Sequence, residues 1–259
     1  MKTIDKINVC IDYIKRFFKE SKGEKAIIGI SGGKDSTVAA ALCVEALGKE
    51  NVIGVMLPLG TQKDIEDSQR VCEFLGIGGY TVNIERPFNA LVSMIASAHI
   101  PEFNTKGPSQ QTIINLAPRL RMSTLYAIAQ TVNGRVINTT NACERFVGYG
   151  TLFGDTVGDL ALLKNLTVSE IYEIGDALGL PHDLVHKTPA DGLTGKSDED
   201  VLGVFYSEIE TFMKTNGKVP ECDWHEADPY FPGHFSKIYE LHKNSEFKRQ
   251  IINVPGPEF

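Results

Sequence analysis

The sequence is poor in the features of secreted, zinc-stabilised and membrane-spanning proteins. Its 259 residues contain five widely spaced cysteines, with neither a CxxC pair nor a Cys/His cluster at zinc-binding spacing. No stretch approaches the roughly 18 consecutive apolar residues of a membrane-spanning helix. These absences exclude a disulfide scaffold, a structural zinc site and a membrane span, and they lead us to expect free thiols and a cytoplasmic protein.

Positive charge is also scarce. The 26 Lys and Arg residues are outnumbered by 33 Asp and Glu residues, which leaves a net charge of −7 at pH 7. Proteins that bind the phosphate backbone of nucleic acids carry the opposite excess. We therefore expect no nucleic-acid partner and no membrane partner. A hydrophobic content of 42% in a chain of this length is enough to form a core.

Short apolar runs alternate with helical patterns in the first half of the chain. The runs are rich in Ile and Val and favour buried strands. Such alternation is typical of parallel strands joined by right-handed crossovers, and it predicts an α/β fold with a doubly wound, Rossmann-like parallel sheet. Strands are expected at residues 26–30, 52–57, 80–84 and 135–139, and helices at 3–20, 36–47, around 65–75, 88–98 and 112–132.

The pattern changes after residue 140. A glycine-rich loop is expected over residues 141–159, followed by helices at 167–178 and 198–214 and an irregular tail. Thr167 and Ser197 each precede an acidic residue by three positions, which is close to the capping-box arrangement at a helix start. We interpret residues 1–259 as one domain, with a sheet core at 25–140 and substrate loops and extra C-terminal helices at 141–259.

The strongest local motif is GISGGKDS at residues 29–36, between a predicted strand and a predicted helix. The carboxyl end of a strand in an open parallel sheet is where such folds bind ligands. Gly32 and Gly33 allow backbone N–H groups to approach an anion, and Ser31 and Ser36 add hydroxyl donors. The start of the helix contributes its positive dipole end, so the loop is suited to a pyrophosphate group.

The loop matches neither common nucleotide motif. Asp35 stands where the phosphate loop of Walker type needs Ser or Thr, and Ser31 stands at the second glycine of the dinucleotide pattern. An aspartate beside phosphates requires a cation between them, so we interpret Asp35 as a ligand of Mg²⁺. The alternative is a tight turn in which Asp35 merely favours the first helical turn through the helix dipole.

SGGKDS resembles the signature of the ATP pyrophosphatases of the adenine-nucleotide α-hydrolase type, which cleave ATP to AMP and pyrophosphate. Three later segments resemble one branch, the ammonia-dependent NAD synthetases. They are NLAPRLRMSTLY at residues 115–126, TTNACERFVGYGTLFGDTVGDL at 139–160 and KTPADGLTGKSDEDVLGVFY at 187–206.

The resemblance implies a role for each matching position. It implies that Asp35 and Lys34 are catalytic, that Asp35 and Glu144 are the Mg²⁺ ligands, and that ATP is a co-substrate. The implied contacts to the acid substrate are Arg119, Asp159, Lys187 and Lys248. The implied ATP contacts are Gly29, Ile30, Ser31, Gly32, Gly33, Lys34, Asp35, Ser36 and Thr139.

The implied reaction is the amidation of deamido-NAD with ammonia, through an adenylated carboxylate, to give NAD, AMP and pyrophosphate. Fewer than about 30 residues precede the loop, too few for a glutaminase domain, so we expect free ammonia as the nitrogen source. The resemblance also implies a homodimer with contacts in residues 88–132. Loops 141–159 and 186–197 are candidate lids over the reaction.

The chain departs from the better-known family pattern at four positions. Leu152 replaces an expected lysine, Val168 replaces another, Ala190 replaces a threonine, and Phe247 replaces a histidine. These changes fit either a divergent branch of the same enzyme or a shifted substrate, and we favour the divergent branch because the metal and phosphate positions remain. The cations that could compensate are Lys164, Lys187, Lys248 and Arg249.

Two other functions remain open at this point. Another ATP pyrophosphatase, such as an amidotransferase or a tRNA-thiolating enzyme, would share the loop, although a tRNA enzyme normally has a basic surface and paired catalytic cysteines. A non-catalytic ATP-binding module resembling universal stress proteins would need neither Asp35 nor Glu144.

Overall fold

The structure is a computed structural model of the chain, and it describes all residues except 63, 99, 103–106, 188–196 and 217–230. A five-stranded sheet lies at its centre. The strands are β1 Lys25–Gly29, β2 Val52–Met56, β3 Gly78–Thr81, β4 Gly134–Asn138 and β5 Leu160–Ala161. Within the described residues every helix is too short or too polar to cross a bilayer.

All strand pairs are parallel, in the order β3-β2-β1-β4-β5. The register places Ile28 of β1 opposite Gly54 of β2, and Ile27 opposite Val136 of β4. From β1 the chain builds the sheet first toward β3 and then, on the other side, toward β5. The strand order therefore reverses between β1 and β4, and a ligand is expected beyond the carboxyl ends of these two strands.

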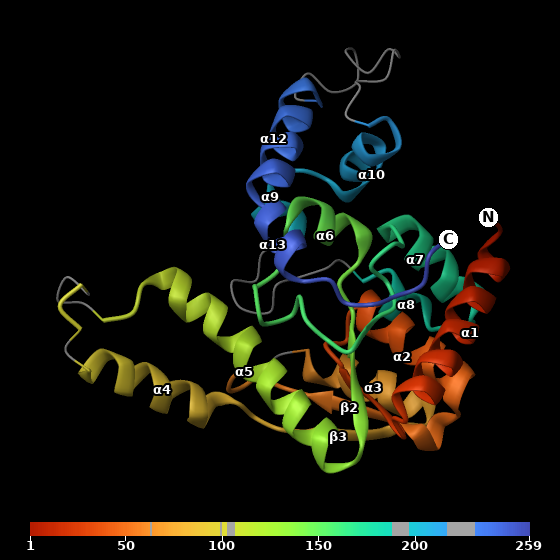
Figure 1. Cartoon of the computed structure of the whole chain (residues 1–259), viewed down its shortest axis with the longest axis horizontal. Coiled ribbons are helices and arrows are strands. Elements are labelled where there is room, and N and C mark those ends of the chain that lie inside the picture. The colour runs from red at the N-terminus through yellow and green to blue at the C-terminus, as the bar shows by residue number, and fades with distance from the viewer. Residues whose placement is uncertain (63, 99, 103–106, 188–196, 217–230) are drawn as a thin grey trace.

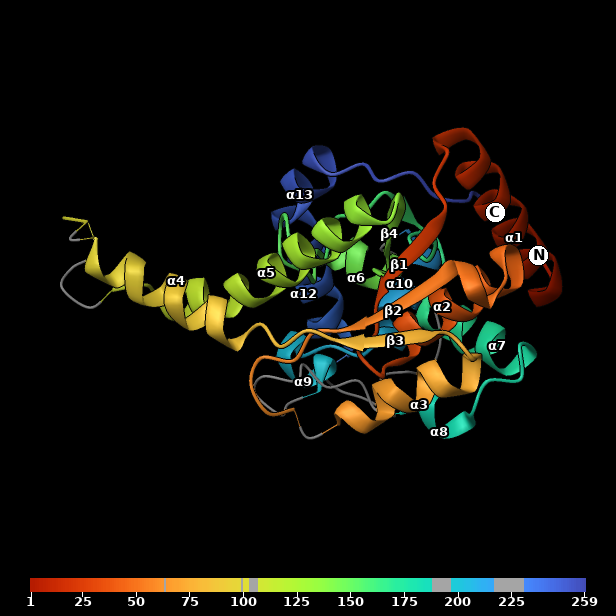
Figure 2. The ribbon, with the colours of Figure 1, turned by 90° about the horizontal axis from the view of Figure 1, so that it is seen from below.

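Helices cover both faces of the sheet, because alternate side chains of a buried strand point in opposite directions. Ala26 and Ile28 of β1 belong to a core cluster with α1 Thr3–Ser21, α2 Lys34–Leu47, α3 Ile65–Leu75, α7 Val168–Ala177 and α8 His182–Val185. Ile27 belongs to the opposite cluster, with α4 Glu85–Ser97 and α5 Gln110–Thr131. Figure 2 shows α3 and α5 on opposite sides of the strands, so the predicted doubly wound sheet is confirmed.

Two parts extend from this sheet. Helices α4 and α5 project together as an arm in both views (Figures 1 and 2), and Met94 on α4 is 70% exposed. The C-terminal helices lie above the sheet in Figure 1, and most of them share a core cluster that includes Val147, Leu202, Ile209 and Ile238. Those that contribute to the cluster are α6 Ala142–Val147, α9 Asp198–Leu202, α10 Tyr206–Lys214 and α12 Phe231–Asn244. Helix α13 Glu246–Ile251 follows α12 and has no buried residue.

Some predicted elements need correction. The expected loop at 141–159 contains α6, which forms because Asn141 and Glu144 make a capping box at its start. The single helix expected at 198–214 is two helices, since Gly203 ends α9 in the left-handed conformation with φ of 63°. The third strand lies at Gly78–Thr81 instead of 80–84, and β5 was not expected.

Other predictions are confirmed. Thr167 and Ser197 make the expected capping boxes of α7 and α9. The last residues after α13 are irregular, and the carbonyl oxygen of Pro255 accepts a hydrogen bond of 2.8 Å from the N–H of Ala161. Four of the cysteines are free and buried, and Cys222 lies outside the described residues.

Candidate active site

The loop after β1 has a backbone that only glycine allows at one position. Gly32 has φ of 79°, and a Cβ atom there would lie 2.9 Å from Cβ of Asp67 and 3.0 Å from the backbone nitrogen of Ser68. Both the dihedral angle and the close approach of α3 therefore require glycine. The second glycine of the motif, Gly33, is the N-cap of α2.

Two serines fix the shape of this loop. The hydroxyl oxygens of Ser31 and Ser36 are 3.1 Å apart, the Ser36 hydroxyl donates to the carbonyl of Gly33 at 3.1 Å, and the Gly33 N–H donates to the Ser31 hydroxyl at 3.2 Å. No side chain caps the start of α2, so its first N–H groups can bind an anion. These hydrogen bonds give the loop a shape that suits a phosphate group.

A cavity opens beside this loop, and we call it the loop cavity. It encloses about 1010 Å³ including its open mouth, and the loops after β1, β2 and β4 contribute to its wall. Every predicted catalytic and metal-binding residue lines it. The lining residues are Ser31, Gly33, Lys34, Asp35, Ser36, Asp64, Thr139, Thr140, Glu144, Tyr149, Asp155, Lys187 and Asp198.

Asp35 and Glu144, which we call the acid pair, meet in this cavity from helices α2 and α6. The side chain of Asn141 joins them: its amide donates to Oδ1 of Asp35 at 3.1 Å, and its backbone N–H donates to Oε2 of Glu144 at 3.0 Å. Burial raises the pKa of Glu144 well above its usual value, and the nearby charge of Asp35 adds to this rise, although the Lys34 ammonium opposes it.

The acid pair has the donor chemistry of a magnesium site. Mg²⁺ prefers oxygen ligands and is commonly held by one or two carboxylates together with substrate phosphates. Among the residues that the structure describes, no group of three or more His, Cys, Asp or Glu side chains is arranged to hold a metal ion. The residues present therefore fit a cation that takes its remaining ligands from phosphate and water.

A second cavity adjoins the first along the carboxyl ends of β1, β2 and β4, and we call it the sheet-edge cavity. It encloses about 970 Å³, and Ser31, Asp64, Thr139 and Asp155 line both cavities. Its walls combine apolar side chains with polar ones, which suits a flat heterocycle with polar edges next to the phosphate loop. The predicted ATP contacts Gly29 and Ile30 lie here, with Val55, Leu57, Gln62, Arg121, Met122, Leu125, Ile137 and Asn138.

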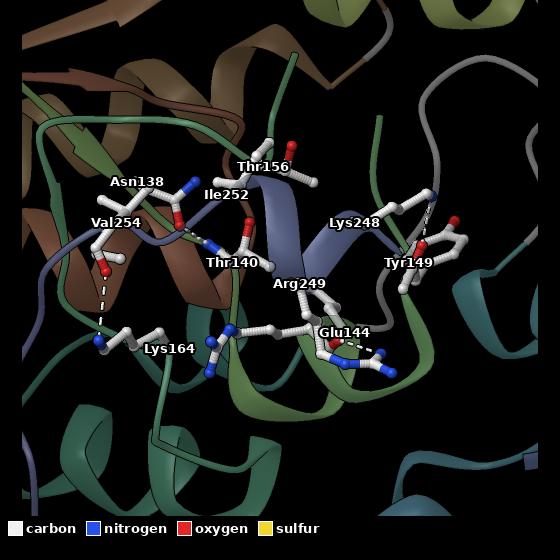
Figure 3. A pocket seen from close by; sticks show the side chains of 13 residues that line it. Asn138, Thr140, Glu144, Tyr149, Thr156, Lys164, Lys248, Arg249, Ile252 and Val254 are labelled. Atoms are coloured by element: carbon white, nitrogen blue, oxygen red, sulfur yellow. Dashed lines mark hydrogen bonds between the residues drawn. The ribbon is translucent and has the colours of Figure 1, made fainter. Parts of the chain in front are cut away.

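The third cavity, shown in Figure 3, has a basic lining, and we call it the basic cavity. It encloses about 500 Å³ including open solvent and shares Thr140, Glu144 and Tyr149 with the loop cavity. The cationic residues in its wall are Arg145, Lys164, Lys248 and Arg249. An acidic protein thus gathers positive charge next to the place where two anionic substrates would meet.

Two of the predicted substrate contacts line these cavities. Lys187, in the loop cavity, donates to Asp64 at 3.1 Å and to Asp67 at 2.6 Å. Lys248, in the basic cavity, donates to the carbonyl oxygens of Gly148 at 2.8 Å and Gly150 at 2.7 Å, and so holds the backbone after α6. Burial lowers the pKa of Lys248, whereas the charge of Asp155 opposes that effect.

The other two predicted substrate contacts lie outside these cavities. The guanidinium of Arg119 donates through Nε to the carbonyl of Leu152 at 3.1 Å. Asp159 accepts the N–H of Val136 at 2.8 Å and a hydrogen bond from Tyr126, whose pKa is raised to about 12 by burial and by this carboxylate. Both side chains hold neighbouring elements together in this structure, and their contact with substrate stays a prediction.

Sequence reasoning gave no role to several residues that line the cavities, among them Arg121 and Asp155. Arg121, two positions after Arg119, donates through Nε to the carbonyl of Leu57 at 2.9 Å, and burial lowers the pKa of its guanidinium. Asp155 lines the first two cavities, accepts the N–H of Thr151 at 2.5 Å, and has a pKa raised by burial. The GD dipeptide in the TLFGD segment was the signal for Asp155, whereas helical spacing gave no preference between the two arginines.

The three described positions that depart from the family pattern do not line these cavities. Leu152 contributes its carbonyl to Arg119, Val168 is buried at the first position of α7, and Phe247 is 51% exposed. Ala190 lies outside the described residues. Of the cations expected to compensate, Arg249 donates to the carbonyls of Phe146 and His242, and Lys164 donates to that of Val254.

Known proteins resemble the chain over nearly its whole length. The chain is 34% identical to an NH(3)-dependent NAD(+) synthetase of Thermococcus kodakarensis over 98% of the chain and 96% of the relative. It is 36% identical to the same enzyme of Pyrococcus horikoshii over 96% of the chain and 94% of the relative.

Solved structures agree. The structure of NMN synthetase from Francisella tularensis superposes with a TM-score of 0.83 at 31% identity, covering 98% of this chain and 99% of that one. NH3-dependent NAD synthetase from Campylobacter jejuni superposes with a TM-score of 0.76 at 25% identity, covering 98% and 100%. The family model described as NAD synthase matches residues 6–252, and with these relatives it shows that the chain belongs to the NAD synthase family.

Proposed function

We propose that the chain amidates deamido-NAD with ammonia, at the expense of ATP, to give NAD, AMP and pyrophosphate. The observation that supports this most directly is the loop cavity. It combines a phosphate-binding loop with the acid pair at the reversal of strand order, in a chain of the NAD synthase family. The sheet-edge cavity would hold the adenosine of ATP, with Leu57 and Met122 against the ring.

In the first step, a carboxylate oxygen of the nicotinate attacks the α-phosphorus of ATP. The bond from that phosphorus to the bridging oxygen breaks, and pyrophosphate leaves into the glycine loop. The N–H groups at the start of α2 and the hydroxyls of Ser31 and Ser36 stabilise the charge on the departing pyrophosphate. Asp35 and Glu144 would hold Mg²⁺, which when bound supplies neutralising charge for the phosphates.

In the second step, ammonia attacks the carbonyl carbon of the adenylate. The bond from this carbon to the phosphate oxygen breaks, AMP leaves, and one proton is released as the amide forms. Asp155, which lies in the cavity wall with a pKa raised by burial, would orient the ammonia or accept that proton. Water must stay out of the site while the adenylate exists. Segment 186–197, of which residues 188–196 lie outside the described part, stays a candidate lid, whereas segment 141–159 holds the buried start of α6 and Glu144.

An assay that measures two products of the same reaction tests this function. Purified protein is incubated with ATP, Mg²⁺, ammonium and deamido-NAD, and both NAD and AMP are measured. We expect equal amounts of the two products, and no AMP when deamido-NAD is omitted. AMP release that does not depend on the acid would contradict the proposal, and so would replacement of ammonium by glutamine without loss of rate.

A second candidate substrate is the corresponding mononucleotide acid, whose amidation would give NMN. One relative of high structural similarity is named NMN synthetase, and Leu152 replaces a lysine that deamido-NAD-binding relatives are expected to use. The cationic residues of the basic cavity suit a terminal phosphate as well as a bridging one. Comparison of kcat/KM for the two acids under the same conditions decides between them.

The proposal includes a homodimer and a cytoplasmic location. The projecting arm of α4 and α5 overlaps residues 88–132, where the contact is expected, and it exposes Met94. A solution mass equal to one chain, measured with substrate at assay concentration, would contradict the dimer.

A further inference from the structure

Lys34 carries a buried ammonium group directly behind the acid pair. Its side chain is 2% exposed, and Nζ lies 2.9 Å from Oδ2 of Asp35. On its other side, the ammonium faces the ring of Tyr206 at 5.3 Å from the ring centroid. The residue lines the loop cavity, but its ammonium is buried between Asp35 and the ring of Tyr206 on α10.

This position is unfavourable for a lysine unless partners stabilise it. Burial disfavours the charged form, and the first turn of a helix, where Lys34 begins α2, has the positive end of the helix dipole. The compensating groups are the carboxylate of Asp35, the charge of Glu144 and the face of an aromatic ring. Lys34 is therefore held in place by the same carboxylates that would bind a metal ion.

Both oxygens of Asp35 are already occupied by donors. Oδ1 accepts the amide of Asn141, and Oδ2 accepts the ammonium of Lys34. Oε2 of Glu144 accepts the backbone N–H of Asn141. Since no further carboxylate or histidine completes a metal-binding group within the described residues, a free cation would find few ligands and a resident positive charge.

We propose that Lys34 is a positioning residue that neutralises the acid pair from the core side, so that a divalent cation binds together with the nucleotide and hardly at all without it. The inference rests on the proposed function, because it takes Asp35 and Glu144 as the metal-facing pair. This role of Lys34 differs from the direct ATP contact that the family resemblance implies. The phosphates of ATP supply the ligands and the negative charge that the acid pair alone lacks.

The test compares thermal unfolding of the wild type and Lys34→Met with Mg²⁺ alone, without nucleotide. Methionine keeps an unbranched apolar side chain, one atom shorter than that of lysine, and removes the charge. We expect Mg²⁺ to raise the Tm of the wild type by less than about 1 °C and that of Lys34→Met by at least ~3 °C. Lys6→Met is the matched control, because Lys6 is also buried and paired with one carboxylate, Glu170, at 2.5 Å. It should show no Mg²⁺-dependent rise.

Equal Mg²⁺ shifts in the wild type and Lys34→Met would overturn the proposal. Should that variant fail to fold, electron paramagnetic resonance of Mn²⁺ with the wild type gives an independent answer. We expect bound Mn²⁺ only when a non-hydrolysable ATP analogue is present, and nucleotide-independent binding of similar affinity would overturn the proposal. Neither readout uses turnover, so an inactive protein in the deamido-NAD assay would count against the proposed function alone.

Discussion

The side-chain amide of Asn141 donates a 3.1 Å hydrogen bond to Oδ1 of Asp35, across 106 residues of sequence. The same side chain accepts the N–H of Glu144 at 3.0 Å and caps α6. One asparagine thus starts the helix that carries one member of the acid pair and orients the other member. The geometry of the site depends on this contact between the loops after β1 and β4.

Replacement of Asn141 tests that contact. Asn141→Asp keeps the helix cap but places a carboxylate against Asp35, so we expect kcat/KM to fall by at least ~10-fold while α6 remains folded. Asn141→Ser keeps a cap without adding charge and should lose less activity. Steady-state kinetics with circular dichroism checks both variants, and full activity in Asn141→Ser, which lacks the amide, would contradict an orienting role for it.

The positive φ of Gly32 predicts a large effect for one methyl group. Gly32→Ala should destabilise the protein by about 1–3 kcal/mol and abolish measurable ATP binding, because the added Cβ meets Asp67 and the backbone of Ser68. Gly179→Ala is the control, since Gly179 has φ of 69° and no atom lies within 4 Å of the added Cβ. Gly179→Ala should lose stability but keep ATP binding. Isothermal titration calorimetry with ATP measures binding. Equal ATP affinity in the two variants would contradict the loop conformation described for Gly32.

Asp159 offers a choice between two roles. Because its carboxylate accepts the N–H of Val136 and a hydrogen bond from Tyr126, we expect Asp159→Asn to lower unfolding stability by about 1–2 kcal/mol with little change in the KM for the acid substrate. Urea unfolding and substrate kinetics on the same preparation measure both effects. A KM raised tenfold with unchanged stability would restore the direct substrate contact that the family resemblance implies.

The ion pair between Lys6 and Glu170 predicts a pH dependence of stability. Burial alone would raise the pKa of Glu170, but hydrogen bonds from Lys6 and the N–H of Thr167 lower it below its ordinary value of 4.5. A lowered folded-state pKa contributes stability above the ordinary value, and this contribution is lost as the pH falls through the folded pKa. Lys6→Met should therefore be less stable than the wild type at pH 7 and nearly equal in acid. A constant difference at both pH values would exclude this linkage.

The sequence predicted the fold well where hydrophobic patterns are local. The strands and helices up to residue 140 lie within a few residues of their expected positions, because buried strands and amphipathic helices leave clear periodicity. Helix α6 was missed because it is six residues long and its capping residue, Asn141, looks like a loop residue in sequence. The two-residue strand β5 has no pattern of its own and forms by pairing with β4.

The sequence predicted which residues gather at the site better than it predicted how their side chains are oriented. The motif located Asp35 and Glu144, and the structure brings them together. Motif spacing could not show that the Lys34 ammonium points into the core, nor that Arg121 lines a cavity while Arg119 lies outside it. These orientations depend on contacts with α10 and with the loop after β2, which are distant in sequence. The role of each residue in substrate binding and the one-domain interpretation stay predictions.

We propose that this chain joins ammonia to a nicotinate nucleotide through an adenylate. The most direct measurement follows oxygen from a carboxylate labelled with ¹⁸O in deamido-NAD. Attack on the α-phosphorus and later displacement by ammonia predict one labelled oxygen in the AMP and none in the pyrophosphate. Label that stays out of AMP while NAD forms would contradict the adenylate, and absence of NAD would contradict the proposed function.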